Sequence, residues 1–127
     1  MKKFLVFIAV AMSLTTVQAQ EQVMTKEKGV TVVNTTTLAK DVDGYAGPTP
    51  LKIHIKKNKI VKVEALKSQE GPKYYARVKK QLFPQWEGMT VKKAQAAELD
   101  GVTGATYTAN AVKENVKRGL DYYNKHK

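Results

Sequence analysis

The sequence contains no cysteine, and it contains only two histidines, His54 and His126. Without cysteine the chain forms no disulfide and offers no thiolate ligand to a metal ion. His54 alternates with lysines on an expected strand, and His126 lies in a charged tail, so both side chains are expected to be exposed. A nucleophilic triad also needs a base beside its nucleophile, and no base adjoins the threonine-rich segment at residues 103–108. These absences argue against a self-sufficient hydrolase.

Long apolar runs are also scarce, and the one exception lies at the N-terminus. Lys2 and Lys3 precede an apolar stretch at residues 4–12, and Val17-Gln18-Ala19 offers a cleavage site with small residues. This pattern predicts a signal peptide over residues 1–19 and an exported chain, periplasmic or otherwise extracytoplasmic. The stretch is shorter than the roughly 20 residues of a membrane-spanning helix, so an uncleaved anchor is the less favoured alternative.

Acidic residues are half as numerous as basic ones, 11 against 22, which gives a formal charge of +11. Such a balance favours anionic partners, although nucleic acid is not an expected partner of an exported protein. The lysines are dispersed along the chain rather than gathered in one block. A solvated basic surface also explains this distribution, so the charge alone identifies no function.

The chain is predicted to fold as one α+β domain, with a small antiparallel sheet and helices packed on one side of it. Residues 20–28 are polar and are expected to be loose, whereas the β-branched run at residues 29–38 predicts a strand. Residues 20–40 thus form a segment with one strand, and the main domain is expected to span residues 41–127. A loop rich in glycine and proline opens that domain at residues 41–50.

Alternation of apolar and polar residues at 51–56 and 60–66 predicts a β-hairpin. Asn58 suits the turn between the two strands, because asparagine tolerates a left-handed backbone. On the second strand the odd-numbered residues from Val61 to Ala65 are expected to share one face.

After residues 68–72 the spacing of the apolar residues changes from that of a strand to that of a helix. Proline suits the first turn of a helix, and a helix is predicted to begin at Pro72. Tyr74, Val78 and Leu82 are expected to form its apolar stripe. Pro84 is expected to end it, because proline lacks the N–H group that the helix needs.

Two further helices are predicted after this point. Thr90 is a suitable N-cap for a short helix at residues 91–99. An apolar stripe from Val112 to Tyr123 marks a final helix that reaches about Asn124.

The sequence DGVTGATYT, at residues 100–108, concentrates small and hydroxyl side chains just before this final helix. Gly101 and Gly104 allow open backbone conformations and close approach of a ligand. The helix that follows offers unpaired N–H groups and a positive dipole end, both of which favour an anion. The segment therefore indicates a phosphate site, unless it is an ordinary helix start capped by Thr106 or Thr108.

The stretch DGVTGAT resembles the attachment motif of the FMN-binding domain family, which includes flavin-carrying subunits of sodium-pumping quinone reductases and of Rnf-type electron-transfer complexes. The resemblance implies that the Thr106 hydroxyl carries FMN as a phosphoester, made by a magnesium-dependent transferase that uses FAD. Asp100, Thr103, Gly104 and Ala105 would form the context that this transferase recognises. A flavin-attachment turn is then expected just before the C-terminal helix.

Two further segments extend the resemblance to about residues 40–124. The stretch GYAGP at residues 44–48 is similar to a Gly-Tyr-Gly-Gly stretch of the family, and either direct flavin contact or a plain loop would explain it. The stretch QEGP at residues 69–72 is similar to a Glu-Thr-Pro turn of the family, but Gly71 replaces the threonine. If that threonine binds flavin in relatives, the contact is missing here, and Glu70 serves alone or faces solvent.

The ring system of FMN needs an apolar or aromatic surface and a few polar groups. Tyr45, Trp86 and Tyr107 are candidates for this surface, because each is expected in a loop or beside the motif. Packing in the core is an equally good interpretation of Trp86. Tyr74 and Tyr75 are assigned to core or surface positions.

Together these features predict an exported flavoprotein that passes electrons between redox partner proteins at or outside the membrane. The sequence has no nicotinamide-binding fingerprint and no evident catalytic acid or base, so an electron carrier is expected rather than an enzyme. A reversible FMN-binding or phosphate-binding module is one alternative. A cofactor-free basic protein that binds surface polyanions is the other.

Overall fold

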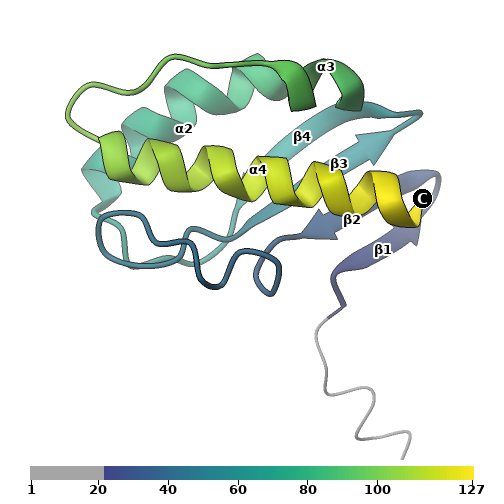
Figure 1. Ribbon diagram of the computed structural model, residues 1–127, viewed down its shortest axis with the longest axis horizontal. Helices are drawn as coiled ribbons and strands as arrows, with labels where there is room; N and C mark the ends of the chain where they lie inside the picture. The colour runs from purple at the N-terminus through teal and green to yellow at the C-terminus, as the bar shows by residue number, and fades with distance from the viewer. Residues whose placement is uncertain (1–21) are drawn as a thin grey trace, which may run out of the picture.

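The computed structural model describes residues 22–127, so the predicted signal peptide lies outside the described residues. In chain order the elements are β1 (Met24–Glu27), β2 (Val30–Asn34), β3 (Leu51–Lys56), β4 (Lys59–Ala65), α2 (Pro72–Trp86), α3 (Val91–Ala96) and α4 (Thr106–His126). The strands form one sheet in the order β1-β2-β3-β4, and every neighbouring pair is antiparallel (Figure 1). The predicted α+β class is therefore confirmed.

Both outer strand pairs of the sheet close through two-residue turns with a left-handed backbone. Lys28 and Gly29 link β1 to β2 with φ angles of 52° and 80°. Lys57 and Asn58 link β3 to β4 with φ angles of 52° and 61°. Two successive positive φ angles match the twist of antiparallel strands, and the turn predicted at Asn58 is confirmed.

The polarity of residues 20–28 predicts a loose segment, but strand β1 lies within it. That expectation is wrong for Met24–Glu27, which is mostly exposed and therefore shows no apolar alternation. Backbone pairing with β2 stabilises it, with Thr25 opposite Val32. The strand predicted at residues 29–38 is present in a shorter form as β2.

A β-bulge in β4 changes which side chains face the core. Ile55 pairs with Ile60, and the next pair along the strands skips Val61. Ile60 and Val63 are therefore both buried, whereas Val61 is 48% exposed. The expectation that Val61 shares a face with Val63 and Ala65 is wrong for this reason.

Helix α2 continues through Pro84 and ends at Trp86, so the expectation that Pro84 ends the helix is wrong. The proline removes one backbone hydrogen bond, to the carbonyl of Lys80. Phe83 and Trp86 on either side of it are buried in the core, with their ring centroids 6.3 Å apart. This packing stabilises the last turn despite the missing hydrogen bond.

Helix α3 begins after Thr90, whose hydroxyl accepts a hydrogen bond from the Lys93 N–H at 3.1 Å. The predicted cap is thus confirmed, although the helix is shorter than expected and ends at Ala96. Helix α4 confirms the final helix and its buried stripe from Val112 to Tyr123. None of the helices in the described part of the chain is long and apolar enough to cross a membrane.

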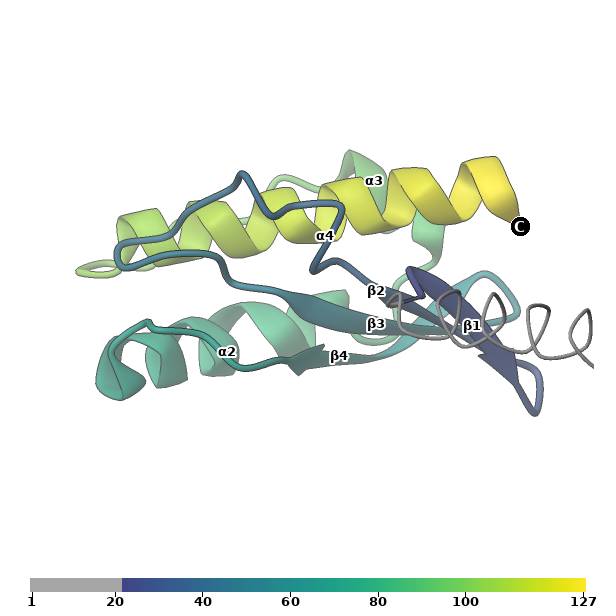
Figure 2. The same ribbon diagram turned by 90° about the horizontal axis from the view of Figure 1, so that it is seen from below.

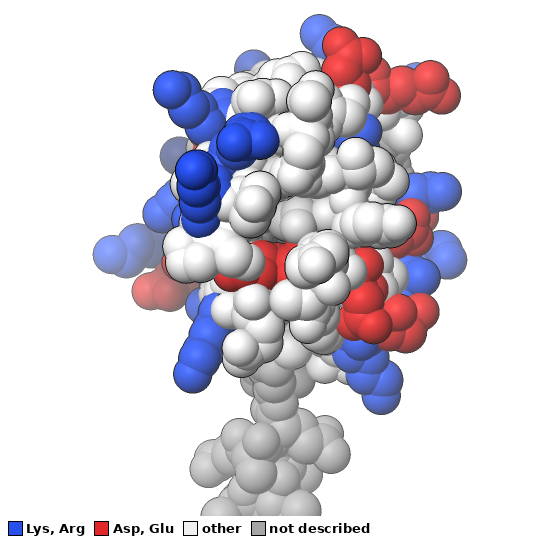
Figure 3. Space-filling view, turned by 90° about the vertical axis from the view of Figure 1, so that its left-hand side faces the viewer, with Lys and Arg blue, Asp and Glu red and all other residues white. Residues whose placement is uncertain are grey.

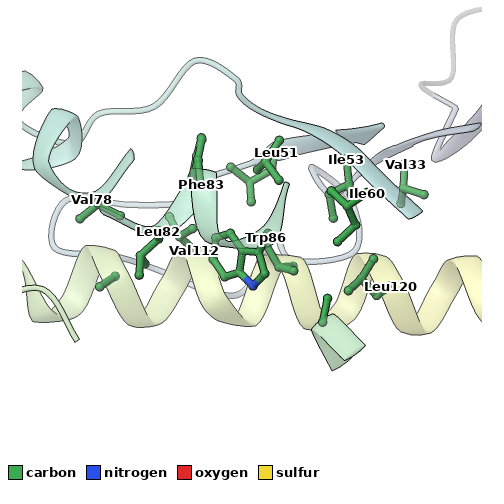
Figure 4. Packing of buried hydrophobic residues seen from close by; sticks show 14 of the residues in the cluster. Val33, Leu51, Ile53, Ile60, Val78, Leu82, Phe83, Trp86, Val112 and Leu120 are labelled. Atoms are coloured by element: carbon green, nitrogen blue, oxygen red, sulfur yellow. The ribbon is translucent and has the colours of Figure 1, made fainter. Parts of the chain in front are cut away.

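Helix α4 lies along one face of the sheet and contacts β2 and β3 (Figures 1 and 2). Gly119 allows this close approach, because a Cβ there would meet the Ile53 side chain at 2.7 Å. Helix α2 contacts both β4 and α4. The apolar side chains of these elements meet in the core shown in Figure 4.

On the face of the sheet opposite the core, a histidine of β3 pairs with a glutamate of β4. The His54 ring nitrogen Nε2 lies 3.0 Å from Glu64 Oε1, and the His54 side chain is half-buried. The expectation of an exposed His54 is therefore wrong, because a cross-strand partner covers the ring. His126 is exposed as expected, and its ring stacks on Tyr122.

Candidate functional site

The turn before α4 is fixed by two small buried side chains. Val102 and Ala105 are buried, and the Ala105 N–H donates to the Val102 carbonyl at 2.9 Å. Gly104 lies between them with a φ angle of 81°, in the left-handed region that favours glycine. Thr103 and Thr106 are exposed. The local sequence therefore buries its apolar residues and leaves two hydroxyl side chains accessible.

Thr106 is the first residue of α4, and it does not cap the helix. Ala105 is the N-cap residue, and no side-chain hydrogen bond is made there. The alternative of an ordinary helix start capped by Thr106 or Thr108 is therefore wrong. The Thr108 hydroxyl is instead buried and donates to the Glu70 carboxylate. The exposed Thr106 hydroxyl has no hydrogen-bond partner within residues 22–127.

A buried carboxylate links the segments that the sequence singled out. Glu70 is 6% exposed and accepts hydrogen bonds from the Tyr45 N–H at 2.8 Å and the Ala46 N–H at 2.6 Å. It also accepts one from the Thr108 hydroxyl at 2.6 Å. A Cβ at Gly44 would overlap the carboxylate, so glycine is required there. Glu70 thus holds this loop against the first turn of α4, and the alternative that it faces solvent is wrong.

Tyr75 lies in the core near this carboxylate, and its hydroxyl has no hydrogen-bond partner among the described residues. Burial, together with the negative charge of Glu70, raises the pKa of Tyr75 far above its ordinary value. The Lys79 ammonium lies 5.3 Å from the centroid of its ring. Tyr75 therefore remains a neutral phenol at any ordinary pH and is a core residue.

A cleft of about 270 Å³ opens beside the start of α4 and is lined by Tyr45, Gly71, Tyr74 and residues 104–108. Three of these lining residues are exposed tyrosines, Tyr45 at 82%, Tyr107 at 68% and Tyr74 at 52%. Figure 3 shows this end of the molecule, where the middle of the face is mostly uncharged with some acidic atoms visible, and lysine and arginine side chains lie mainly around it. The cleft thus combines aromatic walls with an accessible hydroxyl group.

The structure brings most of the predicted site residues to this cleft. The predicted residues that line it are Tyr45, Gly104, Ala105, Thr106 and Tyr107. Glu70 holds the loop that forms one wall. Asp100 and Thr103 are exposed in the adjoining turn and do not line the cleft. Trp86 lies apart from it, 3% exposed in the core against Phe83, so core packing is the better of the two interpretations of Trp86.

Sequence reasoning missed two residues of α2 beside the cleft, Tyr74 and Arg77. Tyr74 was expected in the apolar stripe, but the buried stripe runs through Tyr75, Val78 and Leu82, and Tyr74 is exposed on the cleft. Arg77 donates from Nη1 to the carbonyl of Thr103 at 2.9 Å. The i, i+3 spacing of Tyr74 and Arg77 was the available signal, because it places both on one side of the helix away from the stripe.

Such a cleft suits a ligand with a flat aromatic part and a phosphate group. The exposed tyrosines supply aromatic surface, and the unpaired N–H groups at the start of α4 favour an anion. Gly71 and Gly104 place no side chain between a ligand and the backbone. The fold and the cleft therefore define a small α+β domain that binds a phosphate-bearing aromatic ligand.

Residues 44–121 match the FMN-binding domain family. The chain belongs to this family, as the resemblance over about residues 40–124 predicted, and the match spans every residue that lines the cleft. FMN is therefore the cofactor of this domain. No curated protein is similar enough to the chain to be matched with it.

Proposed function

We propose that this chain is an exported flavoprotein that carries FMN through a phosphoester on the Thr106 hydroxyl and transfers electrons outside the cytoplasm. The observation that carries the proposal is the state of Thr106. Its hydroxyl is exposed at the edge of the cleft, and Ala105 rather than Thr106 is the N-cap of α4. A threonine with no structural task at this position is available for modification.

Attachment is a group transfer from FAD. The Thr106 oxygen bonds to the phosphorus on the FMN side of the pyrophosphate, the bond from that phosphorus to the bridging oxygen breaks, and AMP leaves. The hydroxyl proton passes to a base of the transferase. Neither a carboxylate nor an imidazole is among the described residues that line the cleft, so a separate FAD-dependent transferase supplies the base and the magnesium ion. This transferase is the partner that matures the protein.

The residues of the cleft suit the bound product. The N–H groups at the start of α4 favour the phosphate, and Tyr45, Tyr74 and Tyr107 offer their ring faces to the flavin. FMN itself supplies redox chemistry, because it accepts and returns one or two electrons. A covalent bond keeps FMN on an exported chain, because a dissociated FMN could not be replaced from the FMN inside the cell. Without an acid or base in the cleft, the protein acts as a carrier.

The redox partners are proteins at or outside the membrane. The excess of basic over acidic residues, which persists after removal of residues 1–19, favours acidic partner surfaces, and attraction between opposite charges raises association rates at low salt. Stopped-flow electron transfer measured across ionic strength tests this point. Rates that stay constant across ionic strength would show that electrostatic attraction does not steer these partners together.

Attachment is tested by making the protein with and without an FMN transferase and locating the flavin by peptide mass. Thr106→Val should abolish the modification, and Thr106→Ser should keep it, because serine retains the hydroxyl. Thr37→Val is the matched control, since Thr37 is also an exposed threonine but lies outside the motif at residues 100–106, and this variant should still be modified at Thr106. A yellow protein that is unmodified and releases its colour on denaturation would show instead a reversible FMN-binding module.

A further inference from the structure

We propose that Arg77 is the residue that positions the turn before Thr106 and pairs with the phosphate of FMN. The proposal rests on the function proposed above and adds a residue to its site. Arg77 lies on the second turn of α2, which runs beside the start of α4. It belongs to neither the buried stripe of α2 nor the attachment motif.

The guanidinium group of Arg77 is held against the backbone of the turn. Its Nη1 donates to the carbonyl of Thr103 at 2.9 Å. A Cβ built on Gly104 would lie 2.9 Å from the same nitrogen, so glycine at this position leaves the space that the guanidinium occupies. The Tyr74 ring lies 6.0 Å from the guanidinium carbon, at the outer limit of a favourable cation–π contact. Arg77 therefore contacts the backbone of the turn at Thr103 and Gly104, three and two residues before Thr106.

The charge of Arg77 has no acidic partner among the described residues. The sequence has two arginines among its 22 basic residues. Arg118 pairs with Asp41 at 2.6 Å and with Glu114 at 2.9 Å, whereas no carboxylate pairs with Arg77 within residues 22–127. A half-buried cation beside a cleft, without an acidic neighbour, is free to pair with an anionic ligand.

The chemistry of arginine fits a phosphate in particular. A guanidinium group has five N–H donors in a planar fork that matches two phosphate oxygens. One hydrogen bond to Thr103 leaves other donors of Arg77 available. The phosphoester on Thr106 keeps one negative charge, so the N–H groups of α4 and the Arg77 fork would stabilise it from two elements. Lysine would supply the charge without the fork.

A pair of ligands isolates the phosphate contact, since FMN and riboflavin differ only in the phosphate group. The probe is unmodified protein made without the transferase, and the dissociation constants of both flavins are measured by fluorescence. Wild type should bind FMN more tightly than riboflavin, and Arg77→Gln should reduce that preference about tenfold with riboflavin affinity unchanged. Lys80→Gln is the matched control, because Lys80 is an exposed cation on the same helix, and it should keep the wild-type preference.

The positioning role is tested by the rate of flavin transfer from FAD, followed by intact mass. Arg77→Gln should be modified about tenfold more slowly, and Arg77→Lys should regain part of the rate because it restores the charge. An Arg77→Gln protein that keeps both the FMN preference and the wild-type rate overturns the proposal. So does an Arg77→Lys protein that regains nothing.

The outcomes separate this proposal from the proposed function. If wild type is never modified but Arg77→Gln loses the preference for FMN, Arg77 pairs with the phosphate and covalent attachment is wrong. If wild type is modified at Thr106 and Arg77→Gln behaves like wild type in both measurements, the attachment is right and the role of Arg77 is wrong.

Discussion

Replacing Glu70 by glutamine removes one charge and almost no volume, so it tests the buried carboxylate directly. Glu70 accepts three hydrogen bonds, from the Tyr45 N–H, the Ala46 N–H and the Thr108 hydroxyl. An amide has only one acceptor oxygen, and its NH₂ group would face at least one backbone N–H, donor against donor. The change therefore loses at least one charge-assisted hydrogen bond and leaves a donor unpaired, which costs about 2 kcal/mol of unfolding free energy.

For a domain of this size, about 2 kcal/mol lowers the midpoint of thermal unfolding by roughly 10 °C. Circular dichroism melts of Glu70→Gln and wild type measure the difference. The matched control is Glu98→Gln, which removes one exposed carboxylate that has no hydrogen bond among the described residues. A Glu70→Gln protein that melts with the control and wild type would refute the view that this carboxylate holds the wall of the cleft.

Three further predictions concern the loop beside Glu70, the core and the ion pair between Asp41 and Arg118. Gly44→Ala should destabilise the protein by about 1–3 kcal/mol, because its Cβ would overlap the Glu70 carboxylate, and a urea melt measures the loss. Trp86→Ala should cost about 3–5 kcal/mol by leaving a cavity in the core, yet the flavin content of the remaining folded protein should match wild type. Hydrogen bonding from Arg118 lowers the pKa of Asp41, so its stabilising effect is present above the ordinary pKa of aspartate and is lost as the pH falls through the lowered pKa. Asp41→Asn should remove that part of the acid-induced decrease in melting temperature.

Local sequence signals predicted the elements that depend on local interactions. Asn58 marked a turn that needs a left-handed backbone, and Thr90 marked a helix cap that its own hydroxyl makes. Alternation predicted β3, and a helical period predicted α4. The motif around Thr106 lies at the cleft, where residues 104–108 form part of its lining.

The errors arise where distant contacts decide the structure. The exposure of Val61 depends on a bulge that only the pairing with β3 reveals. Pro84 stays inside α2 because Phe83 and Trp86 are packed in the core on either side of it. The Thr108 hydroxyl donates to Glu70, which lies 38 residues away in the sequence, and does not cap α4. No window of local sequence contains that information.

The position of Arg77 also depends on a contact between segments that are distant in the sequence. Its side chain reaches a carbonyl 26 residues further along the chain. The sequence analysis did not single out Arg77, and the local sequence does not show which segment lies beside it. The packing of α2 against α4 supplies that answer.

The central claim is that Thr106 carries FMN, and the most direct measurement is the intact mass of the denatured protein purified from its own host. The account predicts a mass raised by one FMN less one water for the wild-type chain, an unmodified mass for Thr106→Val, and the raised mass for the control Thr37→Val. An unmodified wild-type chain from a host that makes an active transferase would contradict it. So would a raised mass that persists in Thr106→Val.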